Sequence, residues 1–370
     1  MGQTHCISSR SLEDFMGRVC QAMGADPDVA GEVARHLVKA NLSGHDSHGV
    51  IRVAQYLAQA EKGDLIPAAR PAIIRETETT ALIDARRGFG QFSTAFALDW
   101  ALKRAERFGV AVATVRHSMH IGRLGHYTER AGEQGYICVL TVGAAGLGVG
   151  GLALYGSRRR FFGANPWSIA VPVQDCPPIM FDGSTSMIAE GKVRVARAKG
   201  VPLPPGCIID KDGQPSTNAE DFYAGGALLP LGGEVAAHKG FGLCLTSALL
   251  GGLAMIDDPN PTMIGASFTP DATESRGRIA GVFLVAINPG WFGDGAHYRA
   301  MVRETVDAAR RVPPAGGFTE ILMPGEPEVR TRARREREGI SLPDATWQDL
   351  VKAGARFGIP LPNEPPAEAT

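Results

Sequence analysis

A strand–helix–strand pattern in the middle of the chain constrains its fold more than any other feature. The apolar run VAVATV (110–115) predicts a strand, residues 124–134 predict a helix, and YICVLTV (136–142) predicts a second strand. Further strands are expected within IIRETETTALIDARRGFG and at WSIAVPV, IMFD, RIAGVFLVAI and EILM, and further helices at 93–108, 187–199, 238–256, 296–311 and 327–338. We therefore expect an α/β fold for the middle of the chain.

Both ends of the chain are expected to be rich in helix. Asp26 followed by Pro27 is typical of a helix N-terminus, and Val29, Val33 and Leu37 follow at helical spacing. Gly44 interrupts this pattern before a second helix, which we expect to end at Gly63. The last residues, PNEPPAEAT, are polar and proline-rich, so we expect them to be disordered.

The composition favours a protein that binds small molecules. The chain has 370 residues and a formal net charge of -1, so it has no overall field that would attract nucleic acid or an anionic membrane. No apolar run reaches the roughly 18 residues that span a bilayer, and the N-terminus lacks the pattern of a secretion signal. The six cysteines have no CxxC spacing. We therefore expect reduced thiols and a cytoplasmic location.

The segment GHDSHGVIRVAQY (44–56) is a candidate catalytic helix. At roughly 100° per residue, His48, Arg52 and Tyr56 lie within about 80° of one another, and the apolar Val50 and Val53 lie on the opposite side. A histidine can transfer protons near neutral pH, and an arginine can bind a carboxylate with two hydrogen bonds. We expect Asp46 or Ser47 to cap this helix, whose N-terminal dipole would favour an anionic substrate.

Two other motifs have a simpler explanation than the one they first suggest. The glycine run 146–151 follows a strand, but neither a crossover helix nor a well-placed acidic residue follows it, so we interpret it as a flexible loop rather than a dinucleotide-binding turn. The pairs His45/His48 and His117/His120 have metal-ligand spacing. A third ligand at a defined helical position is lacking, so we predict no metal. A metal-dependent hydrolase built on these four histidines is kept as an alternative.

Three segments are candidates for binding an anion at the start of a helix. Residues 120–124 lie where the strand 110–115 gives way to a helix, and free backbone N–H groups there can hold phosphate. Residues 182–186 are expected to begin the helix that contains Gly191, and His238 and Lys239 to open an apolar helix. Each signal alone is also explained by ordinary helix capping or by a solvated lysine.

A series of motifs, in a fixed order, resembles the type-2 malate/L-lactate dehydrogenase family, which includes sulfolactate and ureidoglycolate dehydrogenases, diketogulonate reductase and hydroxycarboxylate dehydrogenase B. The motifs are GHDSHGVIRVAQY (44–56), GFGQ (88–91), VRHSMHIGRLGHY (115–127), GANPWSIAVP (163–172), DGSTSMIAEGKV (182–193), GALLPLGG (226–233), HKGFGL (238–243) and PGEPE (324–328). They extend over roughly residues 40–340, and the ordered series is more specific than any single motif.

The resemblance implies an α/β domain that binds a nicotinamide cofactor, NAD or NADP, and differs from the usual Rossmann fold. It also implies a helical domain formed by both chain ends, and assembly into homodimers. The expected divisions are a helical segment 1–75, the cofactor domain 76–315, a C-terminal segment 316–362 that packs back on the helical domain, and a disordered tail 363–370. The implied reaction is hydride transfer between the cofactor and a 2-hydroxy or 2-oxo carboxylate.

The resemblance also assigns roles to individual residues. His48 would be the general acid or base, Ser47 its relay, and Arg52 the clamp for the substrate carboxylate, with Tyr56 and His120 lining the site. The expected cofactor contacts are His120, Ile121, Gly122, Arg123, Leu124, Asp182, Gly183, Ser184, His238, Lys239, Gly325 and Glu326.

Several positions depart from the family pattern. The segment HSMHIG (117–122) replaces a more usual NSNHFG, Ala164 replaces a threonine, Gly183 a methionine and Leu154 a proline. These changes leave the substrate and the choice between NAD and NADP open. They also leave two alternatives: a reductase of cyclic 2-imino acids, and a relative that binds ligands without catalysis.

Overall fold

The computed structural model describes residues 4–145, 150–258 and 279–363. Most of the glycine run 146–151 and of the tail 363–370, for which we predicted a flexible loop and disorder, therefore lies outside the described residues. No helix in the described ranges is long and apolar enough to cross a membrane. All six cysteines are free, and four of them are buried: Cys20, Cys138, Cys207 and Cys244.

The elements alternate between strands and helices through the middle of the chain. The strands are β1 (Thr4–Ile7), β2 (Ala72–Glu76), β3 (Thr80–Asp84), β4 (Val110–Arg116), β5 (Ile137–Ala145), β6 (Leu152–Ala153), β7 (Arg160–Phe162), β8 (Trp167–Val173), β9 (Cys176–Gly183), β10 (Ile208–Ile209), β11 (Pro215–Ser216), β12 (Ala227–Leu228), β13 (Ile279–Ile287) and β14 (Ile340–Pro343). The α-helices are α1 (Ser9–Ala22), α2 (Pro27–Leu42), α3 (Val53–Glu61), α4 (Gly90–Phe108), α5 (Gly125–Glu133), α6 (Glu190–Lys199), α7 (Ala219–Tyr223), α8 (Gly233–Gly251), α9 (Gly295–Arg310), α10 (Glu326–Glu338) and α11 (Asp344–Phe357). The predicted α/β middle and helix-rich ends are confirmed.

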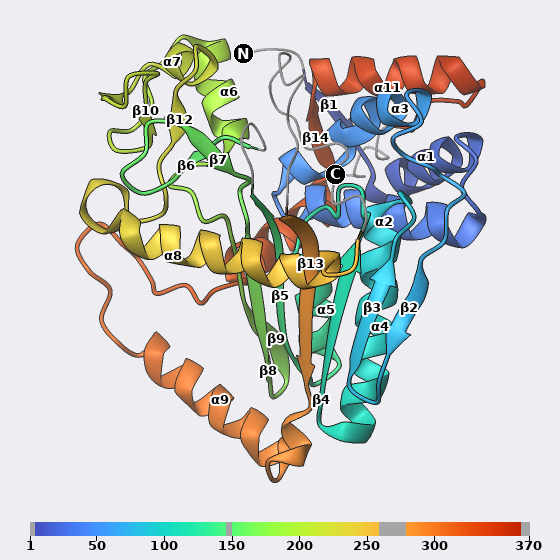
Figure 1. Cartoon of the computed structure of the whole chain (residues 1–370), viewed down its shortest axis with the longest axis vertical. Coiled ribbons are helices and arrows are strands. Elements are labelled where there is room, and N and C mark those ends of the chain that lie inside the picture. Colours follow the sequence, from blue (N-terminus) through green and yellow to red (C-terminus); the bar gives the residue numbers. More distant parts are fainter. Residues whose placement is uncertain (1–3, 146–149, 259–278, 364–370) are drawn as a thin grey trace, which may run out of the picture.

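The central sheet is mixed rather than parallel. The strands β4 and β5 of the predicted strand–helix–strand unit do not pair with each other, because β13 lies between them and is antiparallel to both. The β2–β3 hairpin extends one side through a parallel β3–β4 pair, and β8 and β9 extend the other. A second branch, from β7 to β11, continues from the end of β5 (Figure 1).

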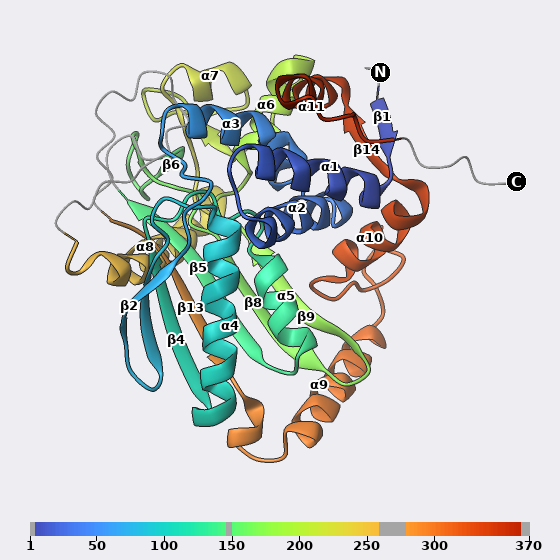
Figure 2. The same ribbon diagram turned by 90° about the vertical axis from the view of Figure 1, so that its right-hand side faces the viewer.

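Helices cover both faces of this sheet. On β13, Val282, Leu284 and Ala286 are buried in the core formed with α4 and α5. The alternate residue Gly281 faces α8, where an added Cβ would overlap the backbone of Gly251. Small residues therefore let α8 lie close against the sheet, crossing its front in Figure 1, whereas Figure 2 shows α4 and α5 along the other side.

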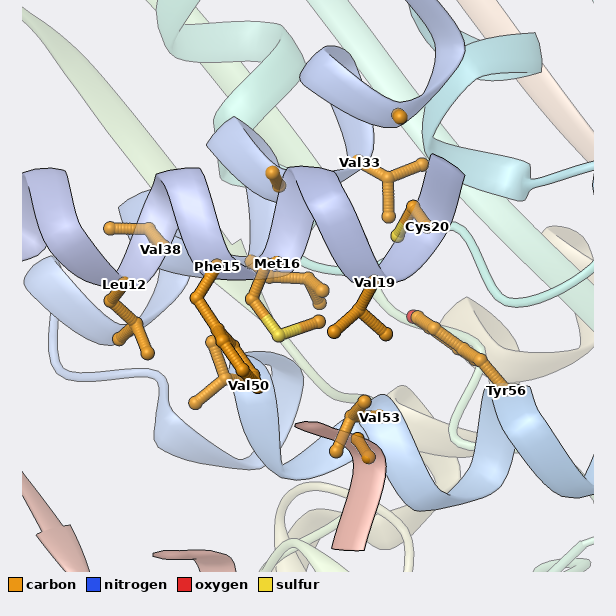
Figure 3. Packing of buried hydrophobic residues seen from close by; sticks show 14 of the residues in the cluster. Leu12, Phe15, Met16, Val19, Cys20, Val33, Val38, Val50, Val53 and Tyr56 are labelled. Carbon is orange, nitrogen blue, oxygen red and sulfur yellow. The ribbon is translucent and has the colours of Figure 1, made fainter. Parts of the chain in front are cut away.

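The two ends of the chain share one hydrophobic core. The strand β1 pairs antiparallel with β14, and buried residues of α1, α2 and α3 pack with Ile340, Leu342, Leu350 and Ala353. Figure 3 shows Val50, Val53 and Tyr56 directed into this core toward α1. The division of the chain into domains at residues 75 and 315 stays a prediction.

Four details of the predicted secondary structure are wrong. No strand forms at EILM (320–323), and the helix expected to begin at 182–186 begins only at Glu190, because Asp182 and Gly183 are the last residues of β9. His238 does not open its helix: α8 begins at Gly233 and is kinked at Ala236, so His238 begins the part after the kink. The fourth error, in segment 44–56, concerns the candidate site itself.

Candidate functional site

The segment 46–52, which carries His48 and Arg52, is not an α-helix. It forms two short 3₁₀ turns, Asp46–His48 and Val50–Arg52, and α3 begins only at Val53. The buried side chain of Asn41 lies at the break, where its Oδ1 accepts a hydrogen bond from the Val50 N–H at 2.9 Å. An added Cβ on Gly49 would overlap this amide, so the close approach requires glycine there. The predicted capping role of Asp46 or Ser47 is wrong, because neither turn has a side-chain cap.

Helix α10, from the other end of the sequence, holds this segment in place. Arg335 donates from Nη1 and Nη2 to the two carboxylate oxygens of Asp46, at 2.7 and 3.0 Å. His45 Nε2 lies 3.1 Å from Glu328 Oε1, and the bond from Asn41 Nδ2 to Asp46 Oδ1 at 2.7 Å completes the arrangement. The segment 46–52 is therefore fixed from both sides by polar side chains.

His48 is a neutral imidazole at neutral pH. Burial, together with the positive charge of Arg52, lowers the pKa of His48 from its usual 6.5 to about 3. Ser47 Oγ lies 3.1 Å from His48 Nδ1. When Nδ1 carries the proton and donates to this hydroxyl, the lone pair of Nε2 is left free to take a proton.

Arg52 is a partly buried cation. Its Nε donates to the Ser47 carbonyl at 2.7 Å and its Nη1 donates to Gln55 Oε1 at 2.8 Å. Within the described ranges of the chain, no carboxylate lies within 4.0 Å of its guanidinium. Burial lowers the pKa of Arg52, which shows that its charge is held at an energetic cost. A bound anion would remove that cost.

A second histidine, His120, faces His48. Their rings are stacked with centroids 5.6 Å apart and an angle of 17° between the planes. The Tyr56 hydroxyl lies 2.8 Å from His120 Nδ1 and accepts a bond from Gln91 Nε2 at 2.6 Å. When Tyr56 donates to Nδ1, the proton of neutral His120 is on Nε2. Tyr56 is thus buried behind His120.

The turn 120–124 is packed against α2. Gly122 has φ +77°, and an added Cβ there would overlap the ring of His36. His36 is fully buried, and its Nε2 accepts a hydrogen bond from the Arg123 backbone N–H at 2.8 Å. Burial lowers the pKa of His36 well below its usual value, so the ring stays a neutral acceptor. Ile121 and Leu124 are buried in the neighbouring core.

The start of α5, which we predicted to hold phosphate, already has an acceptor. Asp182 Oδ2 accepts from the Gly125 N–H at 2.8 Å and lies 3.4 Å from Arg123 Nε. Burial raises the pKa of Asp182 despite the charge of Arg123. Arg123 is 2 % exposed, and its Nε and Nη1 have no hydrogen-bond partner. The buried carboxylate suits a ribose hydroxyl or an amide better than a phosphate.

The remaining predicted cofactor residues lie at the end of β9, at the start of α10 and on α8. Gly183 ends β9, and Ser184 bonds Ser186 Oγ at 2.6 Å. Gly325, with φ +96°, lies against Met180 of β9, whereas Glu326 pairs with Arg310. His238 and Lys239 are exposed on α8. The exposed Lys239 is a cation that could contact the phosphates of a cofactor, whereas the Arg123 guanidinium already lies beside Asp182 and Glu129.

The structure thus brings Ser47, His48, Arg52, Tyr56 and His120 together, as the sequence predicted. The structure also adds two residues to the site. Gln91 belongs to the motif GFGQ (88–91), for which the sequence suggested no role, and nothing in the sequence singled out His36. Of the four histidines of the alternative hydrolase, His48 and His120 lie together, but His45 bonds Glu328 and His117 bonds Asp84 and Asp258. In the described part of the chain, no three His, Cys, Asp or Glu side chains are grouped to hold a metal.

A neutral histidine beside a partly buried arginine that has no carboxylate partner is an arrangement suited to proton transfer next to a bound carboxylate. The chain belongs to the malate/L-lactate dehydrogenase family, whose profile matches residues 7–351. It is accordingly an oxidoreductase that acts on the CH–OH group of hydroxy acids or on the corresponding oxo acids.

Relatives cover almost the whole chain. The hydroxycarboxylate dehydrogenase B of Escherichia coli K12 is 33% identical over 364 residues, which are 97% of this chain and 96% of that protein. A Delta(1)-pyrroline-2-carboxylate/Delta(1)-piperideine-2-carboxylate reductase of Pseudomonas putida is 30% identical over 92% of this chain and 94% of its own length. The crystal structure of malate dehydrogenase from Entamoeba histolytica superposes with a TM-score of 0.88 at 27% identity, covering 98% of this chain and 100% of that one.

Proposed function

We propose that the protein interconverts a 2-hydroxy carboxylate and its 2-oxo acid by hydride transfer with NAD or NADP. The observation that carries this proposal is the neutral His48 beside Arg52, a partly buried cation that lacks a carboxylate partner within 4.0 Å in the described ranges. The bound nicotinamide supplies the hydride acceptor or donor. Asp182, Gly183, Ser184 and the turn 120–124 would hold it, with Lys239 beside its phosphates.

Arg52 binds the carboxylate of the substrate. The planar guanidinium can donate two parallel hydrogen bonds to a carboxylate, and this fixes the orientation of the neighbouring carbon. Because Nε and Nη1 are already held by Ser47 and Gln55, the guanidinium is oriented before the substrate binds. The anion also neutralises the charge that lowers the pKa of His48.

His48 transfers the proton. In the oxidative direction, the free lone pair of Nε2 takes the proton of the substrate hydroxyl as the hydride leaves, and Nδ1–H donates to Ser47. In the reductive direction, protonated His48 gives the proton back to the carbonyl oxygen. His120, with its proton on Nε2, donates a hydrogen bond to the same oxygen while Tyr56 holds its ring.

A kinetic assay tests these roles. The substitution His48→Gln should lower kcat by about 10² to 10⁴-fold, the usual contribution of a positioned acid or base, with the absorbance of reduced cofactor followed at about 340 nm. Arg52→Lys keeps the charge but not the planar fork, so it should raise KM for the 2-oxo acid. His297, exposed at the start of α9, provides the control His297→Gln. Turnover by His48→Gln close to that of the unaltered protein would contradict the assignment.

A reductase of cyclic 2-imino acids is the second candidate. The Pseudomonas putida relative is named as such a reductase, and it covers nearly all of this chain. The same residues would bind the carboxylate and protonate a ring nitrogen instead of a carbonyl oxygen. Comparing kcat/KM for a cyclic 2-imino acid and for pyruvate, with NADH and NADPH in turn, separates the two reactions.

We further propose that the protein is a cytoplasmic homodimer. The family resemblance supports the dimer, and the six free cysteines support a reducing compartment. Light scattering coupled to size exclusion measures the mass of the assembly against the 39.1 kDa of one chain.

A further inference from the structure

Helix α6 begins next to the segment that carries His48 and Arg52. A Cβ added to Gly191, in the first turn of α6, would lie 3.7 Å from the Ser47 Cβ. The carbonyl of Ser47 in turn accepts the hydrogen bond that orients Arg52, at 2.7 Å from its Nε. The side chain of Glu190, the first residue of α6, therefore starts close to the cation that we expect to bind the substrate carboxylate.

Glu190 is nevertheless not paired with Arg52. In the part of the chain that the structure describes, no carboxylate lies within 4.0 Å of the Arg52 guanidinium. Burial lowers the pKa of Arg52, and the negative charge of Glu190 is one of the effects that oppose this shift. The carboxylate and the guanidinium thus attract each other without forming an ion pair.

The hydroxyl of Tyr223 holds the Glu190 carboxylate. Tyr223 is the last residue of α7, which lies next to α6 (Figure 1), and it donates a hydrogen bond to Glu190 Oε1 at 2.8 Å. Burial and this bond raise the pKa of Tyr223 to about 12, so the hydroxyl keeps its proton at neutral pH. The carboxylate therefore has a permanent donor on α7.

The ring of Tyr223 is itself held by its neighbours. The guanidinium carbon of Arg197 lies 4.4 Å from the ring centroid, and Arg197 Nε donates to Glu220 Oε1 at 2.7 Å. On α7, the ring meets Phe222 edge to face, with centroids 5.1 Å apart. Tyr223 is therefore a fixed anchor, whereas glutamate has a long side chain with several rotamers.

We propose that Tyr223 is a positioning residue, which keeps the Glu190 carboxylate away from Arg52 so that the guanidinium stays free for the carboxylate of the substrate. This assignment rests on the proposed role of Arg52, and it goes further by giving a role to two residues outside the site. Without the hydroxyl, Glu190 turns toward the partly buried cation and competes with the substrate for it. Arg194, one turn along α6, is also a cation, but it is exposed, so a pair with it contributes less.

The test is a double-mutant cycle of Tyr223→Phe and Glu190→Gln. Glutamine keeps the size and the hydrogen-bond acceptor of glutamate but not its charge. Tyr298→Phe, which removes a hydroxyl from α9, is the matched control. For each protein, calorimetry measures the Kd of oxamate, an analogue of pyruvate in which an amino group replaces the methyl group, with reduced cofactor present. Steady-state assays measure KM for pyruvate and for the cofactor.

Tyr223→Phe should raise the Kd of oxamate and the KM for pyruvate by about 3- to 10-fold, the effect of one competing ion pair, and leave the cofactor KM unchanged. The double variant should return to within about twofold of the unaltered protein, because the charge that competes is gone. Glu190→Gln alone should bind oxamate at least as tightly as the unaltered protein, and Tyr298→Phe should bind it equally.

Two results would overturn the proposal: an unchanged oxamate Kd in Tyr223→Phe, or a loss that Glu190→Gln does not restore. The second result is the one expected if Tyr223 only joins α7 to α6. An unaltered protein that binds no oxamate would refute both this proposal and the role of Arg52. If it binds oxamate but reduces no 2-oxo acid, the proposed function fails, and the oxamate Kd values still decide the role of Tyr223.

Discussion

The Tyr56 hydroxyl lies 2.8 Å from Nδ1 of His120, although the two residues are 64 positions apart in the sequence. The bond is one step of a chain that runs from Gln91, which donates to the Tyr56 hydroxyl, to His120. Tyr56 is 2 % exposed. In the proposed mechanism it is therefore a positioning residue behind His120, rather than a group at the surface of the pocket.

Replacing Tyr56 with phenylalanine should affect both activity and stability. His120 would lose the donor that keeps its proton on Nε2, so we expect kcat to fall roughly 10-fold, part of what a positioned acid–base group contributes. Gln91 would be left with a buried unpaired N–H, which costs about 1–3 kcal/mol of unfolding free energy. Steady-state kinetics and urea unfolding measure the two effects. A drop in stability with unchanged kcat would show that His120 does not depend on this bond.

Gly122 should tolerate no side chain. The substitution Gly122→Ala would place a methyl group against the ring of His36 at φ +77°, so we expect a loss of about 2–5 kcal/mol in the free energy of unfolding. Gly63 is a matched control, because it has φ +70° but no atom within 4 Å of an added Cβ. Gly63→Ala should cost only about 1–2 kcal/mol. Equal losses in denaturant unfolding would mean that His36 moves aside freely.

The pair Arg335–Asp46 should support activity from a distance. Arg335→Gln would release the segment 46–52 from α10, and a small displacement of His48 can lower kcat/KM by about 10- to 100-fold. Arg337 is exposed near the end of the same helix, so Arg337→Gln is the control. We expect the pH profile of kcat to change only in Arg335→Gln, because the surroundings of His48 change. Identical kinetics in the two variants would contradict a positioning role.

Stability should fall in mild acid because four histidines, two of them buried and two partly buried, are held in the neutral form. Burial lowers the pKa of His36, His48, His120 and His126 in the folded protein. The unfolded chain binds these protons near pH 6.5, so their contribution is fully present above that pH and is lost as the pH falls toward the folded pKa values, about 3 for His48.

Urea unfolding between pH 7.5 and 4.5 measures this dependence. Each group changes the unfolding free energy by up to about 1.4 kcal/mol per pH unit below 6.5. His126→Gln should reduce the slope of the unfolding free energy against pH by up to the contribution of one titrating group, about 1.4 kcal/mol per pH unit. A free energy of unfolding that does not change between pH 7 and 5 would show that these histidines are protonated in the folded state.

The sequence predicted the members of the site better than their local structure. Period and spacing placed Val50 and Val53 correctly on the side that anchors the segment in the core, but they placed Tyr56 on the opposite side, whereas its ring lies in the same core as the two valines. They could not reveal the 3₁₀ turns, since the break is made by Asn41 and held by Arg335, two residues outside the segment. Long-range side-chain contacts of this kind leave no periodic signal.

In the sheet, too, the sequence predicted the elements but not their arrangement. The apolar runs that form β4, β5 and β13 were all predicted as strands, but nothing in their composition indicates that β13 inserts between the other two. His36 was overlooked for a related reason. Its position on α2 reads as part of an apolar helix, and only the fold places its ring beneath Gly122.

The pairing of β1 with β14 has a consequence for synthesis of the protein on the ribosome. The first strand finds its partner only when Ile340–Pro343 has left the exit tunnel, and Arg335 reaches Asp46 at about the same moment. Until then, the core that the helices α1, α2 and α3 share with the C-terminal end of the chain lacks one wall. We therefore expect a nascent chain without α10 and β14 to be inactive, although it already contains every proposed catalytic side chain.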